Sequence, residues 1–133
     1  MVNVSEVMTT KIVAARESTT AMEASTRLLI GNFNGLPVID SSTKVIGIVT
    51  AVDILRTIRQ GGNLHTILVI NIMTPNPIVV KHDTDIAYVI DIILQRSVIL
   101  VPVIDDENRL IGLVGRYDIL RHTLNEKFLT IGH

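Results

Sequence analysis

The chain has 133 residues, a formal net charge of −1 and no cysteine. These values exclude a disulfide scaffold, a thiolate metal site and a cysteine nucleophile. With 12 Lys and Arg against 13 Asp and Glu, the chain also lacks the basic excess that nucleic-acid binding requires. The apolar content of 47% excludes a disordered chain, and a mean hydropathy of +0.45 predicts apolar surface beyond one small core, as for a subunit interface.

Membrane and export signals are not expected. The most apolar window, Ile86–Ile104, is interrupted by Asp91, Arg96 and Pro102, whereas a spanning helix needs about 20 mostly apolar residues. The start of the chain, Met1–Lys11, has no basic region followed by an apolar run, as a signal peptide would. We therefore expect a cytoplasmic protein.

The first half of the chain predicts a strand, a helix, a β-hairpin and a second helix. Ser18, Thr19 and Thr20 offer hydroxyl caps ahead of apolar residues at helical spacing, and the glycines and asparagines of Gly31–Gly35 end that helix. Short β-branched runs flank a polar turn, which is typical of a hairpin. The expected elements are the strand Ile12–Ala15, the helix after Thr20, the strands Leu36–Ile39 and Val45–Val49, and the helix Ala51–Gln60.

The second half repeats this order at a constant offset of 65 residues, without a gap, which indicates an internal duplication. The matching blocks are Met8-Thr9 and Met73-Thr74, Pro37–Asp40 and Pro102–Asp105, and Asp53–Arg56 and Asp118–Arg121. The expected elements are the strand Ile78–Val80, a helix capped within Asp83–Asp85, the strands Leu100–Ile104 and Leu110–Val114, and the helix Arg116–Lys127.

The repeat predicts the fold class and the domain boundaries. A unit of about 55 residues is marginal alone, so two copies are expected to pack together. We predict an α+β protein in which two βαββα repeats pack with pseudo-twofold symmetry into one compact module. The predicted boundaries are 1–62 for the first domain, 63–71 for an apolar, packed linker and 72–133 for the second domain with a short tail.

One motif at the junction of a strand and a helix could carry chemistry. In Gly47–Asp53, the Thr50-x-x-Asp53 spacing fits a capping box, in which hydroxyl and carboxylate satisfy free amides. A carboxylate at this place could instead accept hydrogen bonds from the vicinal hydroxyls of a ribose, beside a helix N-terminus that favours phosphate. The second copy keeps Asp118 but has Gly115 in place of the hydroxyl, so capping alone does not account for the aspartate.

These blocks resemble a known family. Val7-Met8-Thr9, Leu36–Asp40 and Gly47–Leu55 are similar to a CBS domain, named for cystathionine beta-synthase, and Ile72-Met73-Thr74, Val101–Asp105 and Gly112–Leu120 to a second one. No catalytic or transport domain accompanies the repeats, so the resemblance is to stand-alone CBS-domain pairs.

The resemblance implies binding of AMP, ADP, ATP or S-adenosylmethionine in clefts between the two repeats. Asp53 and Asp118 would each hold a ribose, Thr50 would lie beside the first, and Arg116 could contact phosphate, while Gly115 leaves the second cleft without its polar anchor. The first strand of the opposite repeat would line each cleft. The implied ligand-binding residues are Met8, Thr9, Ile12, Val13, Asn34, Gly35, Thr50, Asp53, Met73, Thr74, Ile78, Val79, Arg116 and Asp118.

The remaining patterns favour no other chemistry. The four histidines lack metal-ligand spacing, and no nucleophile elbow or phosphate-binding glycine loop is present, so we expect neither a metal nor a catalytic residue nor a required cofactor. Arg56, Arg59 and Arg121 could face phosphate, but a solvated helix face is the simpler interpretation. We predict a non-catalytic, homodimeric regulatory module that senses an adenosine ligand and acts on an unidentified partner protein. The alternative is an adaptor dimer without a small-molecule ligand.

Overall fold

The computed structural model describes residues 2–131, with side chains placed through residue 125. It is a mixed α+β structure that divides into two compact units. We call them the Asp53 unit, formed by Val13–Ile78 with Asn108–Leu110, and the Asp118 unit, formed by Met1–Ile12, Val79–Glu107 and Ile111–His133. The predicted βαββα order occurs in each repeat.

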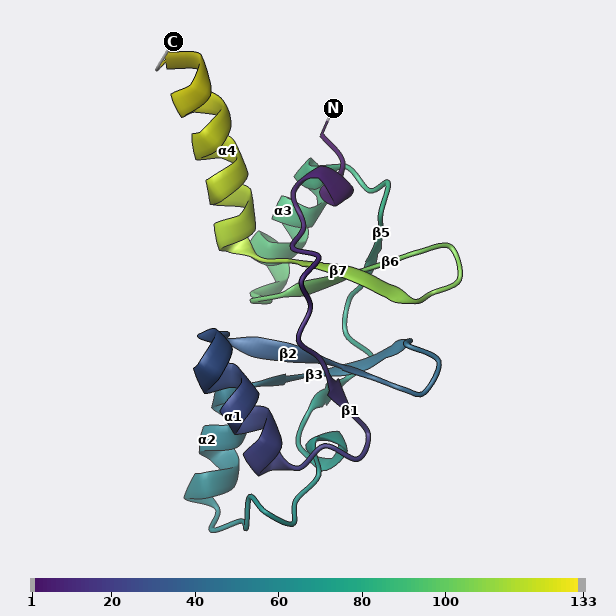
Figure 1. Ribbon diagram of the computed structural model, residues 1–133, viewed down its shortest axis with the longest axis vertical. Helices are drawn as coiled ribbons and strands as arrows, with labels where there is room; N and C mark the ends of the chain where they lie inside the picture. Colours follow the sequence, from purple (N-terminus) through teal and green to yellow (C-terminus); the bar gives the residue numbers. More distant parts are fainter. Residues whose placement is uncertain (1, 132–133) are drawn as a thin grey trace. The chain divides into compact units, whose positions relative to one another are not determined.

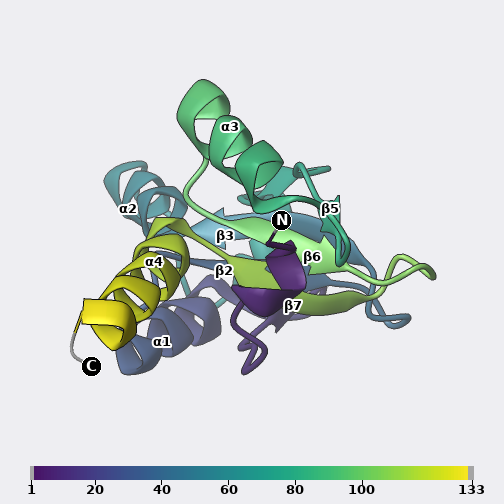
Figure 2. The same cartoon turned by 90° about the horizontal axis from the view of Figure 1, so that it is seen from above.

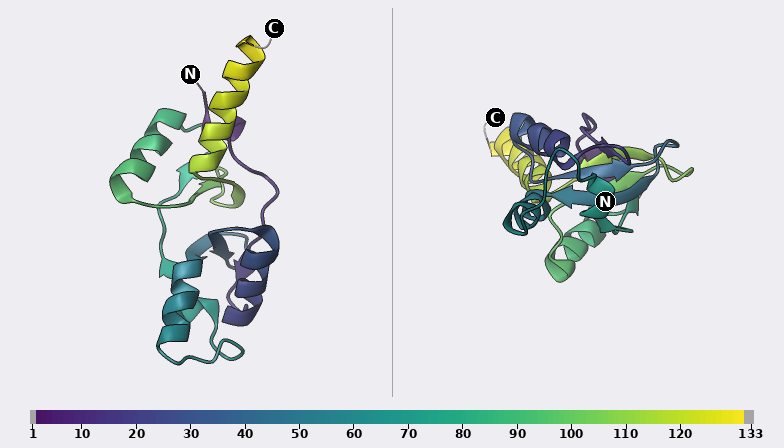
Figure 3. Two further views of the ribbon diagram at one scale, coloured as in Figure 1. Left: turned by 90° about the vertical axis from the view of Figure 1, so that its left-hand side faces the viewer. Right: turned by 90° about the horizontal axis from the view of Figure 1, so that it is seen from below.

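The Asp53 unit contains a four-stranded sheet in the order β1-β2-β3-β4. β1 is parallel to β2, and the other neighbours are antiparallel. Helices α1 and α2 lie next to each other along the β2–β3 hairpin (Figures 1 and 3). The elements are β1 (Ala15–Arg16), α1 (Ala21–Gly31), β2 (Gly35–Ile39), β3 (Val45–Thr50), α2 (Ala51–Arg59), the 3-10 turn η2 (Val69–Asn71) and β4 (Thr74–Pro75).

The Asp118 unit contains a three-stranded sheet in the order β5-β6-β7. The N-terminal turn η1 lies beside the first turn of α3 (Figure 2), where the N–H of Ile86 donates to the carbonyl of Val2 at 2.9 Å. The elements are η1 (Val4–Glu6), β5 (Val80–Lys81), α3 (Ile86–Arg96), β6 (Val101–Ile104), β7 (Leu110–Val114) and α4 (Arg116–Ile131).

The compact units do not coincide with the sequence repeats, because each takes its leading segment from the other repeat. Val4 and Val69, both completely buried, occupy equivalent positions in the two leading segments. The N–H of Val4 donates to the carbonyl of Thr84 at 2.8 Å, and that of Val69 to the carbonyl of Thr19 at 2.9 Å. The same register of backbone hydrogen bonds therefore holds each segment against the opposite repeat.

The helix caps follow the predicted sequence signals. Thr20 accepts from the N–H of Glu23 at 3.1 Å in a reciprocal capping box, and Asp85 accepts from the N–H of Ala87 at 2.9 Å. Asn32 and Ser97 end α1 and α3 in the left-handed conformation, both with φ of 53°. The caps predicted within residues 18–20 and 83–85 are confirmed.

Two predicted strands begin too early. The strand expected at Ile12–Ala15 is β1, Ala15–Arg16, and the one expected at Ile78–Val80 is β5, Val80–Lys81. Each pairs with its neighbour through only two residues, so the apolar residues before them lie outside the sheet and stay partly exposed. The prediction of a packed linker is confirmed, because Val69 is buried and Ile67 packs against the same core.

Candidate functional site

Asp53 lies at the start of α2, where β3 runs directly into the helix. One carboxylate oxygen, Oδ2, accepts from the N–H of Thr50 at 2.8 Å and from its hydroxyl at 3.0 Å. The hydroxyl in turn accepts from the N–H of Asp53 at 3.2 Å, which completes a capping box. The other oxygen, Oδ1, accepts from Arg56 at 3.1 Å. The carboxylate is 8% exposed, so it is held in one orientation close to the surface.

Asp118 has the same place at the start of α4, but a different set of donors. Its Oδ2 accepts from the N–H of Gly115 at 2.7 Å, and its Oδ1 from Arg121 at 2.9 Å. The hydroxyl comes from Thr9, which donates to Oδ1 at 2.7 Å. This carboxylate therefore has a hydroxyl donor although Gly115 cannot provide one, while the expectation that the second cleft lacks a polar anchor for the ligand stays a prediction. The leading segment supplies the hydroxyl donor from a residue 109 positions away.

Both carboxylates keep an unused acceptor position. A carboxylate offers about four acceptor positions, and each aspartate uses three of them for the contacts described above. The ion pairs with Arg56 and Arg121 are the weakest of these contacts, because the two arginine side chains are 59% and 63% exposed. Each carboxylate therefore combines one unused acceptor position with one weakly held ion pair.

The predicted Met-Thr residues each belong to the same compact unit as the aspartate that they were predicted to accompany. Thr9 pairs with Leu113 of β7, and Thr74 pairs with Ile48 of β3 as part of β4, a strand that the sequence analysis did not predict. The unit that contains Asp118 also contains Met8 and Thr9, and the unit that contains Asp53 also contains Thr50, Met73 and Thr74. These residues were predicted to line the two sites.

Other predicted site residues are placed as follows. Asn34 and Gly35 belong to the Asp53 unit, where the carbonyl of Asn34 accepts from Ala51 at 3.0 Å. Their predicted place beside Asp118 stays a prediction. The apolar residues that precede β1 and β5 are partly exposed, as residues that contact a ligand must be. These are Ile12, Val13, Ile78 and Val79.

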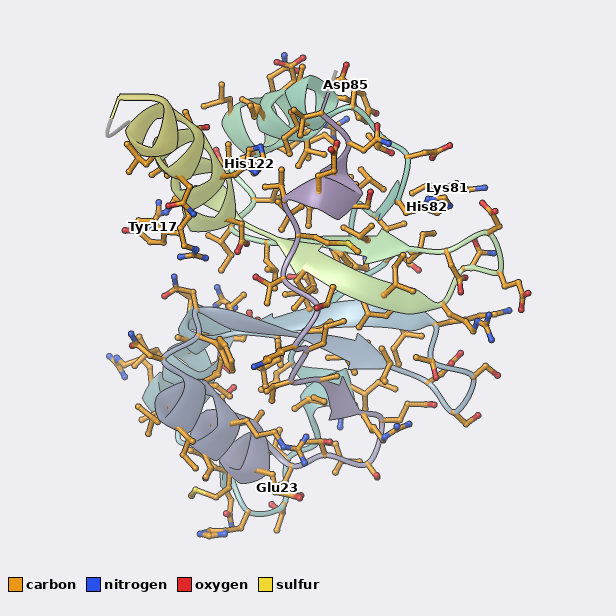
Figure 4. The ribbon with its side chains drawn as sticks, turned by 45° about the horizontal axis from the view of Figure 1, so that its top comes forward. Glu23, Lys81, His82, Asp85, Tyr117 and His122 are labelled. Carbon is orange, nitrogen blue, oxygen red and sulfur yellow. The ribbon has the colours of Figure 1, made fainter. Side chains whose placement is uncertain are left out.

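Arg116, the first residue of α4, does not bind Asp118. Its guanidinium carbon lies 5.3 Å from the ring centroid of Tyr117, which projects from the first turn of α4 (Figure 4). The arginines that do contact the aspartates, Arg56 and Arg121, were judged more typical of a solvated face. The repeated Asp-x-x-Arg spacing was the sequence signal for these pairs, since side chains three apart meet on one helix face.

Metal-binding geometry is absent from the part of the chain that the structure describes. No group of three or more His, Asp or Glu side chains there could hold a metal ion. His82 lies 3.6 Å from Asp106, beside Lys81 at the end of β5 (Figure 4), and this pair is open to solvent. None of the helices within residues 2–131 combines the length and apolar character that crossing a bilayer requires.

Two segments of the sequence, residues 4–60 and 69–125, match the CBS domain. The chain belongs to the CBS-domain family. The second match begins at Val69, inside the segment predicted as a linker, which agrees with the equivalence of Val4 and Val69. The mixed fold that the sequence predicted is thus that of a tandem CBS pair.

Solved structures of CBS pairs share this fold. CBSX2, in a crystal structure in complex with AMP, superimposes with a TM-score of 0.86 and 27% identity over 96% of this chain and 99% of that chain. The CBS pair of protein MJ0100, in complex with 5′-methylthioadenosine and S-adenosyl-L-methionine, has a TM-score of 0.82 and 30% identity over 92% and 99%.

Sequence relatives include much longer proteins. L-aspartate semialdehyde sulfurtransferase of Methanocaldococcus jannaschii is 33% identical over 89% of this chain, but the match covers 22% of the enzyme. The chain spans 22% to 62% of the length of three such relatives. The enzyme name of the sulfurtransferase therefore describes more chain than the CBS repeats that match it.

Proposed function

We propose that this chain is a non-catalytic regulatory module that binds an adenosine-containing ligand at Asp53 and Asp118. The observation that carries the proposal is the equivalent position of the two carboxylates. Each is held at a strand–helix junction by three donors and keeps an open acceptor position. The AMP and S-adenosylmethionine complexes of the related CBS pairs support this ligand class.

The chemistry of the site suits a ribose with an attached polar group. The diol donates to the carboxylate, while the free N–H groups at the start of α2 or α4 favour a negative charge nearby. The partly exposed aliphatic residues Ile12, Val13, Ile78 and Val79 offer apolar contact for a base. No required cofactor is part of the proposal: AMP, ADP, ATP and S-adenosylmethionine are alternative ligands.

Isothermal titration with AMP, 5′-methylthioadenosine and S-adenosylmethionine tests the proposal. We expect at least one to bind, and its 2′,3′-dideoxy analogue to bind at least tenfold more weakly, because the carboxylate then loses both hydroxyl donors. Asp53→Ala and Asp118→Ala should each abolish one class of site. Binding that survives the double substitution would contradict the ribose role, and no binding of any ligand would favour the adaptor alternative.

We also propose that the module is a homodimer that acts on an unidentified protein in the cytoplasm. Exposed apolar side chains on helices of both units support a second copy as the occupant. They are Leu29 and Ile30 on α1, Leu55 and Ile58 on α2, Leu94 on α3 and Leu120 on α4. Light scattering should give a dimer mass that Leu55→Asp with Leu120→Asp reduces to that of a monomer, and a wild-type monomer would contradict this proposal.

A further inference from the structure

Met8 occupies the place of a missing side chain on β7. Gly112 has no Cβ, and a Cβ built there would overlap Sδ of Met8 and lie 2.8 Å from its Cγ. The methionine therefore packs directly against the backbone of the strand. No other residue type at position 112 would allow this approach without a shift of the methionine.

The next residue, Thr9, forms a close antiparallel pair with the strand. Its N–H donates to the carbonyl of Leu113 at 2.8 Å, and the N–H of Leu113 donates to the carbonyl of Thr9 at 2.9 Å. A slip by one residue would turn the Thr9 side chain to the opposite face. The same slip would bring Met8 away from the glycine and against a side chain. Contact between Met8 and Gly112 thus selects the register in which the Thr9 hydroxyl reaches Asp118.

The Asp53 unit has the same contact between a methionine and a glycine, but the hydroxyl donor to its aspartate does not depend on that contact. A Cβ on Gly47 would overlap Sδ of Met73, and the following Thr74 pairs with Ile48. There the carboxylate of Asp53 receives its hydroxyl from Thr50, within its own capping box. The two equivalent methionines therefore differ in their consequence for the neighbouring aspartate.

We propose that Met8 is a positioning residue for the Asp118 site, which it completes by holding Thr9 in register. This inference rests on the proposed function. With its proton donated to Asp118, the Thr9 hydroxyl oxygen keeps its two lone pairs, and Thr9 is an exposed residue. Thr9 and Asp118 together then form a composite acceptor for a diol, assembled from both ends of the chain.

The test follows each site separately by NMR in the full chain, with AMP as the probe. The amide of Gly115 reports on Asp118, and the amide of Thr50 reports on Asp53, because each donates to its carboxylate. Hydrogen exchange of the Thr9 and Leu113 amides reports on the register independently of any ligand.

Three variants distinguish the effect of the contact between Met8 and Gly112 from the effect of the Thr9 hydroxyl. Thr9→Val should weaken AMP at the Gly115 reporter about tenfold, through the lost hydroxyl, and leave exchange at Leu113 slow. Met8→Ala should weaken AMP there several-fold and also speed exchange at Thr9 and Leu113. The corresponding variant, Met73→Ala, should weaken AMP at the Thr50 reporter by a smaller factor than Met8→Ala weakens it at the Gly115 reporter, because Thr50 supplies the hydroxyl donor to Asp53.

A double variant tests whether Met8 and Gly112 act through the same contact. Gly112→Ala should reduce AMP binding at the Gly115 reporter, and adding Met8→Ala should bring no further loss, because the small side chain removes the overlap. Met8→Ala with unchanged AMP affinity at Gly115 would overturn the inference. If AMP shifts neither reporter in the wild type, the proposed function fails, and unchanged Thr9 exchange in Met8→Ala would then overturn the positioning role by itself.

Discussion

Arg56 lies against Asp53 with its Nη1 atom 3.1 Å from Oδ1, although the arginine side chain is 59% exposed and the aspartate side chain only 8%. The pair thus joins a solvated cation to a nearly buried acceptor at a proposed ribose site. An exposed guanidinium contributes little to stability, but it occupies a position that a ribose hydroxyl could use.

We therefore predict that Arg56→Gln changes the free energy of unfolding by less than about 0.5 kcal/mol and tightens adenosine binding a few-fold. Adenosine is the appropriate ligand because it carries no phosphate that the arginine could attract. Urea denaturation and titration calorimetry measure the two effects. Arg59→Gln, which removes an equal charge from the same helix, is the control, and weaker adenosine binding in Arg56→Gln would show that Arg56 assists the ligand.

Thr50 should matter for stability as well as for binding. Thr50→Ala removes the N-cap of α2 and one donor to Asp53, so we expect a loss of about 1 kcal/mol and a melting temperature lower by several degrees. Thermal denaturation checks this. Thr26→Ala, in the interior of α1, removes a hydroxyl that bonds only to the carbonyl of Met22 and should be nearly neutral. Equal losses in the two variants would contradict the capping role.

Because Val4 and Val69 are equally buried, we predict matching effects for the same substitution at the two positions. Each valine is completely buried, so truncation to alanine should cost about 2 kcal/mol in either leading segment. Amide exchange should then locate the damage: Val4→Ala should loosen residues around Thr84, and Val69→Ala residues around Thr19. Faster exchange near Thr19 in Val4→Ala would mean that the leading segments pack on their own repeats.

Glu23 should make a pH-dependent contribution to the free energy of unfolding. Hydrogen bonds from the N–H and hydroxyl of Thr20 lower the pKa of this carboxyl below its ordinary value. A lowered folded-state pKa means that the stabilisation is complete above the ordinary Glu pKa and disappears as pH falls through the folded value. Glu23→Gln should therefore be less stable than the wild type at neutral pH, with the difference vanishing in acid. Urea denaturation midpoints of both proteins, measured from neutral to acidic pH, test this prediction. A stability difference between them that stays constant with pH would exclude the Glu23 carboxylate as its source.

Local sequence signals predicted the helices and hairpins because they depend on neighbours in the chain. Thr20 and Asp85 act through residues two or three positions away, and the polar turns act within five residues, so spacing alone identified them. The capping box of Thr50 and Asp53 was one of two interpretations offered, and the structure contains it. Its presence leaves the ribose interpretation open, since the carboxylate keeps an acceptor position.

Other features could not be predicted from the residues of a single sequence. Both repeats carry the same apolar pattern, so Val4 could pack on either of them, and only the family resemblance placed Met8 and Thr9 with Asp118. Thr9 supplies the hydroxyl donor that Gly115 lacks, and this contact depends on that long-range choice. The strand ends at Ala15 and Val80 depend on how far the pairing extends, which apolar content does not determine.

The exchange of leading segments has a consequence for the order in which the protein folds during synthesis. Nearly all of the Asp53 unit has been synthesised once Ile78 has been added, and every strand of its sheet is then present. The N–H of Val4 has no acceptor until Thr84 has been made, and the N–H of Thr9 has none until Leu113 has been made. Contacts that close such long loops form slowly. The leading segment of the first repeat therefore pairs only after most of the second repeat has been made, and the Asp118 unit is completed after the Asp53 unit.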